Sequence, residues 1–167
     1  RSAVGGESGV RARVSRDGGD VWTDSCVELF VAGRGGGGGY VHLELSRTGA
    51  VLAGAQPAGS ARLQGGGGAP CVGWSAAELG SVRRATGGAE DGEDGCWWGE
   101  VSLPLASLHA RGMCGPGGAG GLAFNACCIK DTGPGGGGHF LSATDLPPPH
   151  EGPFFHQPAG FRDLELG

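Results

Sequence analysis

The stretch Val21–Val31, VWTDSCVELFV, decides the fold of this chain. It is followed, after a run of glycines, by Tyr40–Leu45, YVHLEL, and apolar residues alternate with others in both segments. Because successive side chains leave a strand on opposite sides, a period of two predicts strands with one buried face and one displayed face. The buried face would hold Val27, Leu29, Val31, Val41, Leu43 and Leu45. The displayed face would hold Glu28, His42 and Glu44, with Trp22 at its edge.

Further strand-like segments are spread along the rest of the chain. The predicted strands are residues 10–14, 26–32, 40–46, 49–53, 60–63, 79–85, 98–103, 122–130 and 161–166. Many short strands between glycine-rich turns indicate an antiparallel sandwich rather than alternating strands and helices. One short helix is expected over 105–111, after Pro104 ends the preceding strand. We therefore expect an all-β, two-sheet antiparallel sandwich that forms a single domain over residues 1–167.

Glycine is unusually abundant, with 39 glycines and 10 prolines in 167 residues. Such a content is typical of disordered chains. The glycine runs 35–39, 65–68 and 135–138, however, lie between apolar segments, where hairpin loops would be. Longer loops cost little, because the entropy of loop closure grows slowly with length. We interpret these runs as expanded loops on an ordered framework.

Charge and cysteine content exclude several classes of protein. The net charge is −5 and Lys and Arg form no cluster, which argues against nucleic acid or an anionic membrane surface as the partner. No apolar run approaches the length needed to cross a bilayer. No pair of cysteines has the C-x-x-C spacing of zinc or redox sites. We expect mostly free, structural thiols, although disulfides stay open if the domain is secreted; the cysteines are Cys26, Cys71, Cys96, Cys114, Cys127 and Cys128.

The residues expected on displayed faces have the chemistry that a sugar requires. A sugar ring needs a flat apolar surface, which an indole supplies. Its hydroxyl groups need fixed hydrogen-bonding partners, and a carboxylate forms the shorter and stronger hydrogen bonds. Trp98 and Glu100 share one side of a predicted strand, and Asn125 lies on the side of its strand opposite Phe124. Packing of Trp98 and a turn role for Asn125 are the structural alternatives.

Three segments in order resemble carbohydrate-binding module family 9. They are WTDSCVELFV (22–31), WWGEVSLPLASL (97–108) and HFLSATDLPPPHEGPFFHQPAGFRDLEL (139–166), the last resembling the branch with an FH-x-P…F-x-x-L-x-L tail. The resemblance covers about residues 10–166. It implies a jelly-roll-like sandwich and a non-catalytic module for a polysaccharide or oligosaccharide. Such modules are commonly appended to glycoside hydrolases, which favours an extracellular location.

The resemblance also suggests the site residues. In the family, a tryptophan with an acid six residues later forms part of the sugar site, and Trp22 and Glu28 match that spacing. The candidate carbohydrate-binding residues are Trp22, Glu28, Glu44, Trp98 and Asn125. In relatives a second tryptophan faces the first, at the position held here by Ala143, and an asparagine stands where this chain has Ser46. We therefore expect weak affinity, and the alternative is that Trp22 only caps the sandwich edge beside a solvated Glu28.

Other functions are less well supported. Acids on a wet sheet face are ordinary, and no nucleophile or zinc-protease motif is present, so we expect no catalysis by this domain. No cofactor or metal is expected. Calcium at Asp17, Asp20 and Asp24, or in the loop 90–94, is a weaker interpretation than solvated acids. Haem ligation is disfavoured because Met113, the only methionine, lies in a glycine-rich loop. The main alternative is an interaction or structural module that has lost sugar binding.

The resemblance bears on the start of the chain as well. Because the sequence begins at Arg1 rather than Met, we expect an excerpt or a processed product. The family has one or two further strands ahead of this position. Either these strands are missing or residues 1–9 are their remnant. The tail residues Phe155, His156, Phe161 and Leu164 are expected to lock the C-terminus against the sandwich, with Pro147–Pro149 as a stiff approach.

Overall fold

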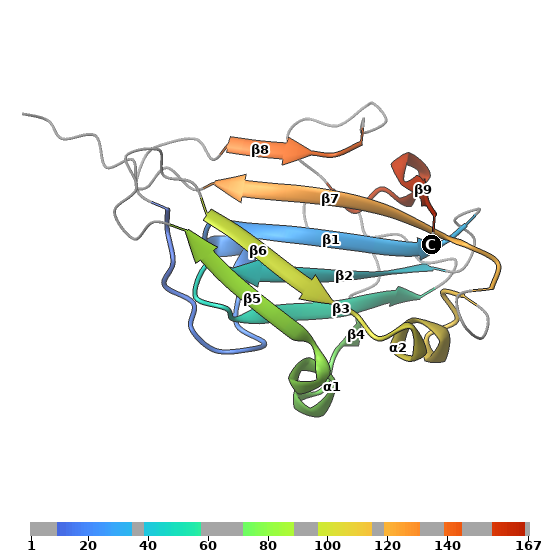
Figure 1. Ribbon diagram of the computed structural model, residues 1–167, viewed down its shortest axis with the longest axis horizontal. Coiled ribbons are helices and arrows are strands. Elements are labelled where there is room, and N and C mark those ends of the chain that lie inside the picture. The colour runs from blue at the N-terminus through green and yellow to red at the C-terminus, as the bar shows by residue number, and fades with distance from the viewer. Residues whose placement is uncertain are drawn as a thin grey trace, which may run out of the picture.

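The chain folds into two layers of antiparallel strands. The computed structural model describes residues 10–34, 39–57, 72–88, 97–114, 119–130, 139–144 and 155–165. A seven-stranded sheet has the order β4-β3-β2-β1-β7-β8, with β9 also paired to β7, and a second sheet is the hairpin β5-β6. Figure 1 shows this hairpin crossing in front of β1, β2 and β3. The predicted all-β, two-sheet sandwich is confirmed.

The described elements have the following bounds. They are η1 (Val21–Thr23), β1 (Cys26–Gly33), β2 (Gly39–Ser46), β3 (Val51–Pro57), β4 (Val72–Gly73), α1 (Ala76–Ser81), β5 (Arg83–Gly88), β6 (Trp97–Ser102), α2 (Leu105–Ala110), β7 (Leu122–Lys130), β8 (His139–Ser142), η3 (Pro158–Gly160) and β9 (Arg162–Leu164). No helix among these is long and apolar enough to cross a membrane.

The apolar face of the large sheet lies against the hairpin, in the predicted register. Val27 pairs with Leu45, and Leu29 pairs with Leu43, so the apolar side chains of neighbouring strands meet on one face. A Cβ atom on Gly99 of β6 would lie 2.8 Å from a methyl group of Leu45, which shows how closely the two layers approach. Val101 and Leu103 pack against the same cluster, as predicted, together with the helix residues Leu79 and Leu108.

The opposite face of the large sheet was expected to be displayed, and this expectation is wrong. Glu28 is only 6% exposed and Glu44 only 4%, and His42 is buried as well. The N-terminal segment, residues 10–25, covers one end of this face, where Val14 and Val21 pack with Cys26 and Ala50. The C-terminal tail covers the other end through Phe155 and Phe161. The alternation is therefore correct, but both faces of β1 and β2 are largely buried.

Several elements differ from the prediction for local reasons. The predicted strand 79–85 is wrong in its first residues, because residues 76–81 form α1 and β5 begins only at Arg83. Ser75 and Glu78 make a capping box that starts this helix: Ser75 N donates to Glu78 Oε2 at 2.8 Å, and Glu78 N donates to Ser75 Oγ at 3.3 Å. Residues 10–14 are irregular. The predicted helix at 105–111 is present as α2. The predicted strand 60–63 and Pro147–Pro149 lie outside the described residues.

Candidate functional site

Four polar side chains lie next to one another across four neighbouring strands. Glu28 of β1 pairs with Glu44 of β2 on one side and with Cys127 of β7 on the other. Cys127 in turn pairs with Ser142 of β8. Directly paired residues of antiparallel strands project to the same face, with their Cβ atoms about 5 Å apart. We call Ser142, Cys127, Glu28 and Glu44 the polar row.

A second row of side chains lies beside the polar row on the same face. Asn125 pairs with Phe30, and Phe30 pairs with His42. Asn125 is fully buried, and its Nδ2 donates to Ser142 Oγ at 3.0 Å, which links the two rows. His42 Nε2 lies 3.8 Å from Glu44 Oε1. The structure therefore brings three predicted site residues, Glu28, Glu44 and Asn125, onto one buried face. We call this face, which carries the polar row together with Asn125, Phe30 and His42, the polar face.

The C-terminal tail, residues 155–165, packs against this face. Tyr40 Oη lies at hydrogen-bond distance, 2.7 Å, from His156 Nδ1. The rings of His156 and Phe30 meet edge to face with centroids 5.1 Å apart. The predicted structural role of the tail is confirmed. The sequence gives no local signal that His156 lies beside the site residues, because the contact joins segments that are far apart in the chain.

Two thiols on the same face are expected to be unreactive, because the pKa of each is raised. Cys26 Sγ donates to Glu28 Oε1 at 3.8 Å. Burial, and then the charges of Glu28 and Glu44, raise the pKa of Cys26 well above its usual range. Burial raises the pKa of Cys127 to about 12, against the opposing effect of its hydrogen bond to Ser142. Only the thiolate is a good nucleophile or metal ligand. None of the four described cysteines forms a disulfide.

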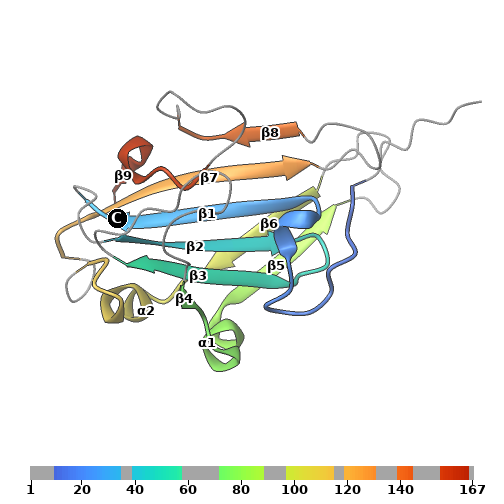
Figure 2. The same ribbon diagram turned by 180° about the vertical axis from the view of Figure 1, so that it is seen from behind.

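Trp22 lies at the edge of this face rather than within it. Its neighbour Val21 is buried and anchors η1, whereas Trp22 itself is 55% exposed. Figure 2 shows η1 in front of the end of the sheet where β1 begins. Cys26 begins β1 on the polar face, and Glu28 follows two residues later on that same face. An exposed indole is thus positioned at the end of the polar face that is nearer to Glu28 than to the tail.

Trp98 does not belong to this group of residues. Gly99 faces the large sheet, so its neighbour Trp98 projects from the outer side of the hairpin, where it is 54% exposed. Glu28 projects from the far side of the large sheet. The structure therefore separates Trp98 from Glu28, Glu44 and Asn125 by the thickness of the sandwich.

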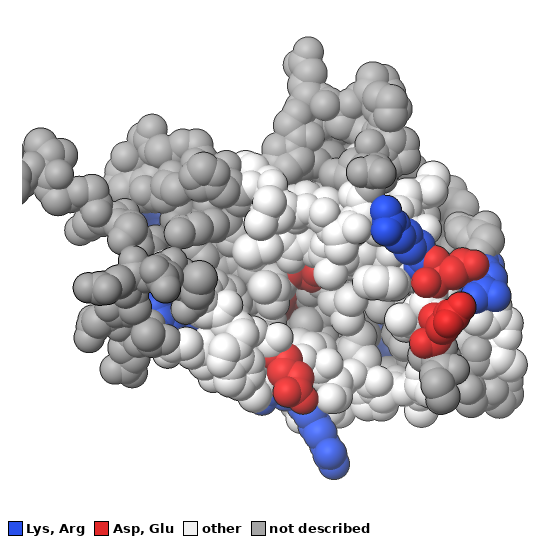
Figure 3. Space-filling model, turned by 45° about the horizontal axis from the view of Figure 1, so that its top comes forward, with Lys and Arg blue, Asp and Glu red and all other residues white. Residues whose placement is uncertain are grey.

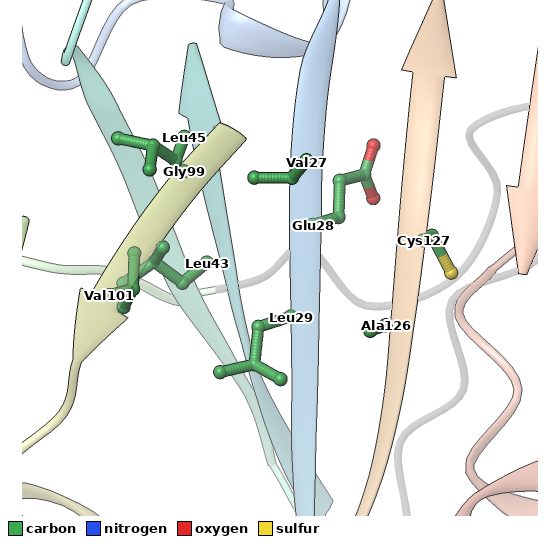
Figure 4. Close-up of a pocket in the computed structure, with 9 residues that line it drawn as sticks. All are labelled: Val27, Glu28, Leu29, Leu43, Leu45, Gly99, Val101, Ala126 and Cys127. Carbon is green, nitrogen blue, oxygen red and sulfur yellow. The ribbon is translucent and has the colours of Figure 1, made fainter. Parts of the chain in front are cut away.

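A pocket of about 320 Å³ opens between the two layers. Its lining is mostly apolar, with Glu28 as the one acidic residue; the lining residues are Val27, Glu28, Leu29, Leu43, Leu45, Gly99, Val101, Ala126 and Cys127. Figure 4 shows Val27 and Leu29 pointing toward the hairpin side, while Glu28 extends toward Cys127. Figure 3 shows a hollow in the surface with acidic atoms at its floor. This pocket is large enough for a small ligand but offers few polar groups.

The chain is similar to a known protein family and to a solved structure. Residues 4–68 match the family described as "Carbohydrate-binding family 9". A crystal structure from Bacteroides uniformis ATCC 8492, described as that of "a putative carbohydrate-binding protein", is similar with 30% sequence identity and a TM-score of 0.67. The likeness covers 93% of this chain and 66% of that one, so the chain spans about two thirds of its length. The resemblance to carbohydrate-binding family 9 is confirmed. A comparison with curated proteins found no match.

The two departures from the family 9 pattern have local structural roles. Ser46 is buried, its Oγ lies 2.5 Å from Thr48 Oγ1, and its hydroxyl donates to the carbonyl of Val14 at 3.4 Å. The backbone N–H of Ala143 donates to the carbonyl of Ala126 at 2.7 Å, which continues the pairing of β8 with β7. Neither position supplies a second indole facing Trp22.

Two of the three aspartates considered for calcium, Asp17 and Asp24, hold the N-terminal residues against the rest of the fold. Asp24 Oδ2 accepts from the backbone N–H groups of Arg13 and Val14, the latter at 2.6 Å. Asp17 accepts from Val51 N at 3.0 Å and pairs with Arg84 at 2.8 Å. Within the described ranges, no three His, Cys, Asp or Glu side chains gather closely enough to hold a metal ion. The loop 90–94 lies outside those ranges.

Proposed function

We propose that this domain binds a segment or the end of a polysaccharide without cleaving it, at the Trp22 end of the polar face. The match to carbohydrate-binding family 9 and the likeness to the Bacteroides uniformis structure support carbohydrate binding in general. One observation carries the choice of site. Glu28, Glu44 and Asn125 share one face of a rigid sheet, and an exposed indole lies at the edge of that face.

In the proposed site, an apolar group stacks on the sugar ring and polar groups hydrogen-bond to its hydroxyl groups. Trp22 would stack on the C–H face of a sugar ring, for which an exposed indole offers a broad flat surface. Glu28 would accept a hydrogen bond from a hydroxyl group, with Asn125 as a neighbouring amide. A hydrogen bond to a carboxylate in a water-poor environment is stronger than one in bulk water. Because Glu28 is only 6% exposed, a single hydroxyl group, not a whole ring, would reach it.

The arrangement of acids is unsuited to glycoside hydrolysis. A glycosidase places two carboxyl groups on either side of the scissile bond, about 5 to 10 Å apart. Glu28 and Glu44 instead lie side by side on adjacent strands, both buried on the same face, with no room for a sugar between them. We therefore include non-catalytic binding in the proposal. We also include a link to a glycoside hydrolase, because modules that resemble this one are commonly joined to such enzymes.

Titration with soluble oligosaccharides tests the proposed site. The variants are Trp22→Ala, which removes the platform, and Glu28→Gln, which keeps the shape of the side chain but removes its charge. Each should lower the affinity for a sugar that the wild type binds by about tenfold, or about 1.4 kcal/mol. Leu141→Ala and Glu165→Gln are matched controls at exposed positions and should bind as the wild type does. If neither test variant weakens binding, the sugar is held elsewhere.

The burial of the polar face also favours a second function. Glu28 and Glu44 are both buried, as in a sheet whose role is purely structural. The alternative is an interaction module that has kept the fold and lost sugar binding. Such a module would show no affinity for any glycan, so a binding screen separates the two functions.

A further inference from the structure

We propose that the outer face of the β5-β6 hairpin is a second carbohydrate contact, a flat platform for a chain of neutral sugar rings. The inference rests on the proposed function for the class of ligand. It uses none of the residues of the polar face, and the two sites lie on opposite sides of the sandwich.

The pairing of the hairpin determines which residues form the platform. Trp98 pairs with Gly87, Glu100 with Ala85, and Ser102 with Arg83. Directly paired residues share a face, and the contact of Gly99 with Leu45 shows that the alternate residues face inward. The six residues therefore line the outer face together. Figure 1 shows this hairpin as the layer nearest the viewer, with the large sheet behind it.

Small residues on β5 keep the platform flat. A Cβ atom on Gly87 would lie 2.6 Å from Cζ2 of Trp98, so the indole lies directly against the backbone of β5. Ala85, the next residue on this face, adds only a methyl group. Trp98 is nevertheless 54% exposed, so much of the indole surface faces away from the described residues. An indole supported from below and open above is suited to stacking against the C–H face of a sugar ring.

Polar side chains flank the indole on the same face of the hairpin. Glu100 lies two residues along β6 on the same face, about 7 Å from Trp98 along the strand. Among the residues that the structure describes, no hydrogen bond or ion pair engages the side chains of Glu100, Ser102 or Arg83. Together they offer carboxylate acceptors, a hydroxyl group and guanidinium donors at the rim of the indole. Hydroxyl groups of a neutral sugar can use both acceptors and donors.

A long polysaccharide is the expected ligand rather than a short one. One indole with exposed hydrogen-bonding groups binds a single ring weakly. A polymer presents many equivalent rings to the same platform, which raises the chance of contact without any new interaction. Since Trp22 and Trp98 lie on opposite sides of the sandwich, the two sites would hold different chains or distant parts of one chain.

Affinity electrophoresis tests this platform separately from the polar face. The gels contain soluble hydroxyethylcellulose, xylan or galactomannan, and titrations with tetrasaccharides from the same polymers run in parallel. Trp98→Ala should weaken retention by the polymer at least fivefold and leave tetrasaccharide binding unchanged. Gly87→Ala, whose methyl group would displace the indole, should act in the same direction, as should Glu100→Gln to a smaller extent. Glu165→Gln is the control.

The outcomes separate this inference from the proposed function. Polymer retention of Trp98→Ala equal to that of the wild type would overturn the platform, whatever Trp22→Ala and Glu28→Gln do. Loss of polymer retention in Trp98→Ala, with both polar-face variants unaffected, would support the platform and overturn the proposed site. A wild type that binds neither polymer nor tetrasaccharide would overturn both. Because Trp98 is exposed, Trp98→Ala should fold, which circular dichroism checks.

Discussion

Glu28 lies between Cys127 and Glu44 on the face of the large sheet that the hairpin does not cover. Two carboxylates directly opposite each other on adjacent strands destabilise a sheet, and burying a charge adds to that cost. His42 Nε2, 3.8 Å from Glu44, offsets part of the repulsion when the imidazole is protonated. A face with only a structural role would be more stable with apolar residues at these positions. The presence of the acids therefore supports a binding role for this face.

The two buried thiols should resist modification in the folded protein. Because the pKa of Cys26 and Cys127 is raised, both stay protonated at pH 8, and burial limits access as well. Iodoacetamide at pH 8 should modify neither in the native state and both in urea, as peptide mass spectrometry would detect. The half-buried Cys114 is the internal comparison. Rapid modification of Cys127 in the native protein would contradict its burial.

Stability should also depend on pH through Cys127. A thiol whose pKa rises on folding stabilises the protein fully below its unfolded pKa, here 9.0, and loses this contribution as pH rises toward about 12. The free energy of unfolding of the wild type should therefore fall more steeply above pH 9 than that of Cys127→Ala. Equal slopes in urea denaturation from pH 7 to 11 would show that the thiol is not protected.

At the scale of elements, the C-terminal tail should contribute strongly to stability. The Phe161 ring lies 6.0 Å from Phe30 and 6.1 Å from Tyr40, centroid to centroid, and so holds the tail against the polar face. Phe161→Ala should lower the free energy of unfolding by about 1–3 kcal/mol, somewhat less than for a fully buried phenylalanine. Leu141→Ala, at a position 69% exposed, should change it little. Equal urea midpoints for the two variants would mean that the tail is not an integral part of the fold.

The elements that sequence alone predicted are those with a strong local pattern. The alternation in 26–32, 40–46 and 122–130 predicted β1, β2 and β7 to within a residue at each end. The predicted strand 79–85 overlaps the end of α1 at residues 79–81, because the capping box of Ser75 and Glu78 starts a helix just before it. The strands β4 and β8 are two and four residues long, too short for a period of two to be recognised.

At the scale of the whole molecule, the packing of the two layers determines which residues lie together, and the sequence could not show this. Alternation gave the correct face for Glu28. No local pattern, however, indicated that His156, which is 116 residues beyond Tyr40, returns to contact Tyr40 on that face. The same limit applies to Trp98. Its chemistry resembles that of Trp22, yet the two-sheet packing places the two indoles on opposite sides of the sandwich. Local patterns predicted the types of residue in the site, and only the tertiary structure showed which of them lie together.

A binding screen of the wild-type domain against a panel of neutral glycans tests the central claim most directly. The fold and the exposed indole predict retention by at least one glycan class. With one indole at the polar face and Ala143 in place of a second tryptophan there, the affinity of that site should be nearer millimolar than micromolar, within about −4 to −8 kcal/mol. The screen therefore needs immobilised glycans at high density and protein at high concentration. Retention that a free sugar of the same class competes away is the expected result. A domain that is folded by circular dichroism and binds no glycan under these conditions would contradict the account, and the interaction module would replace it.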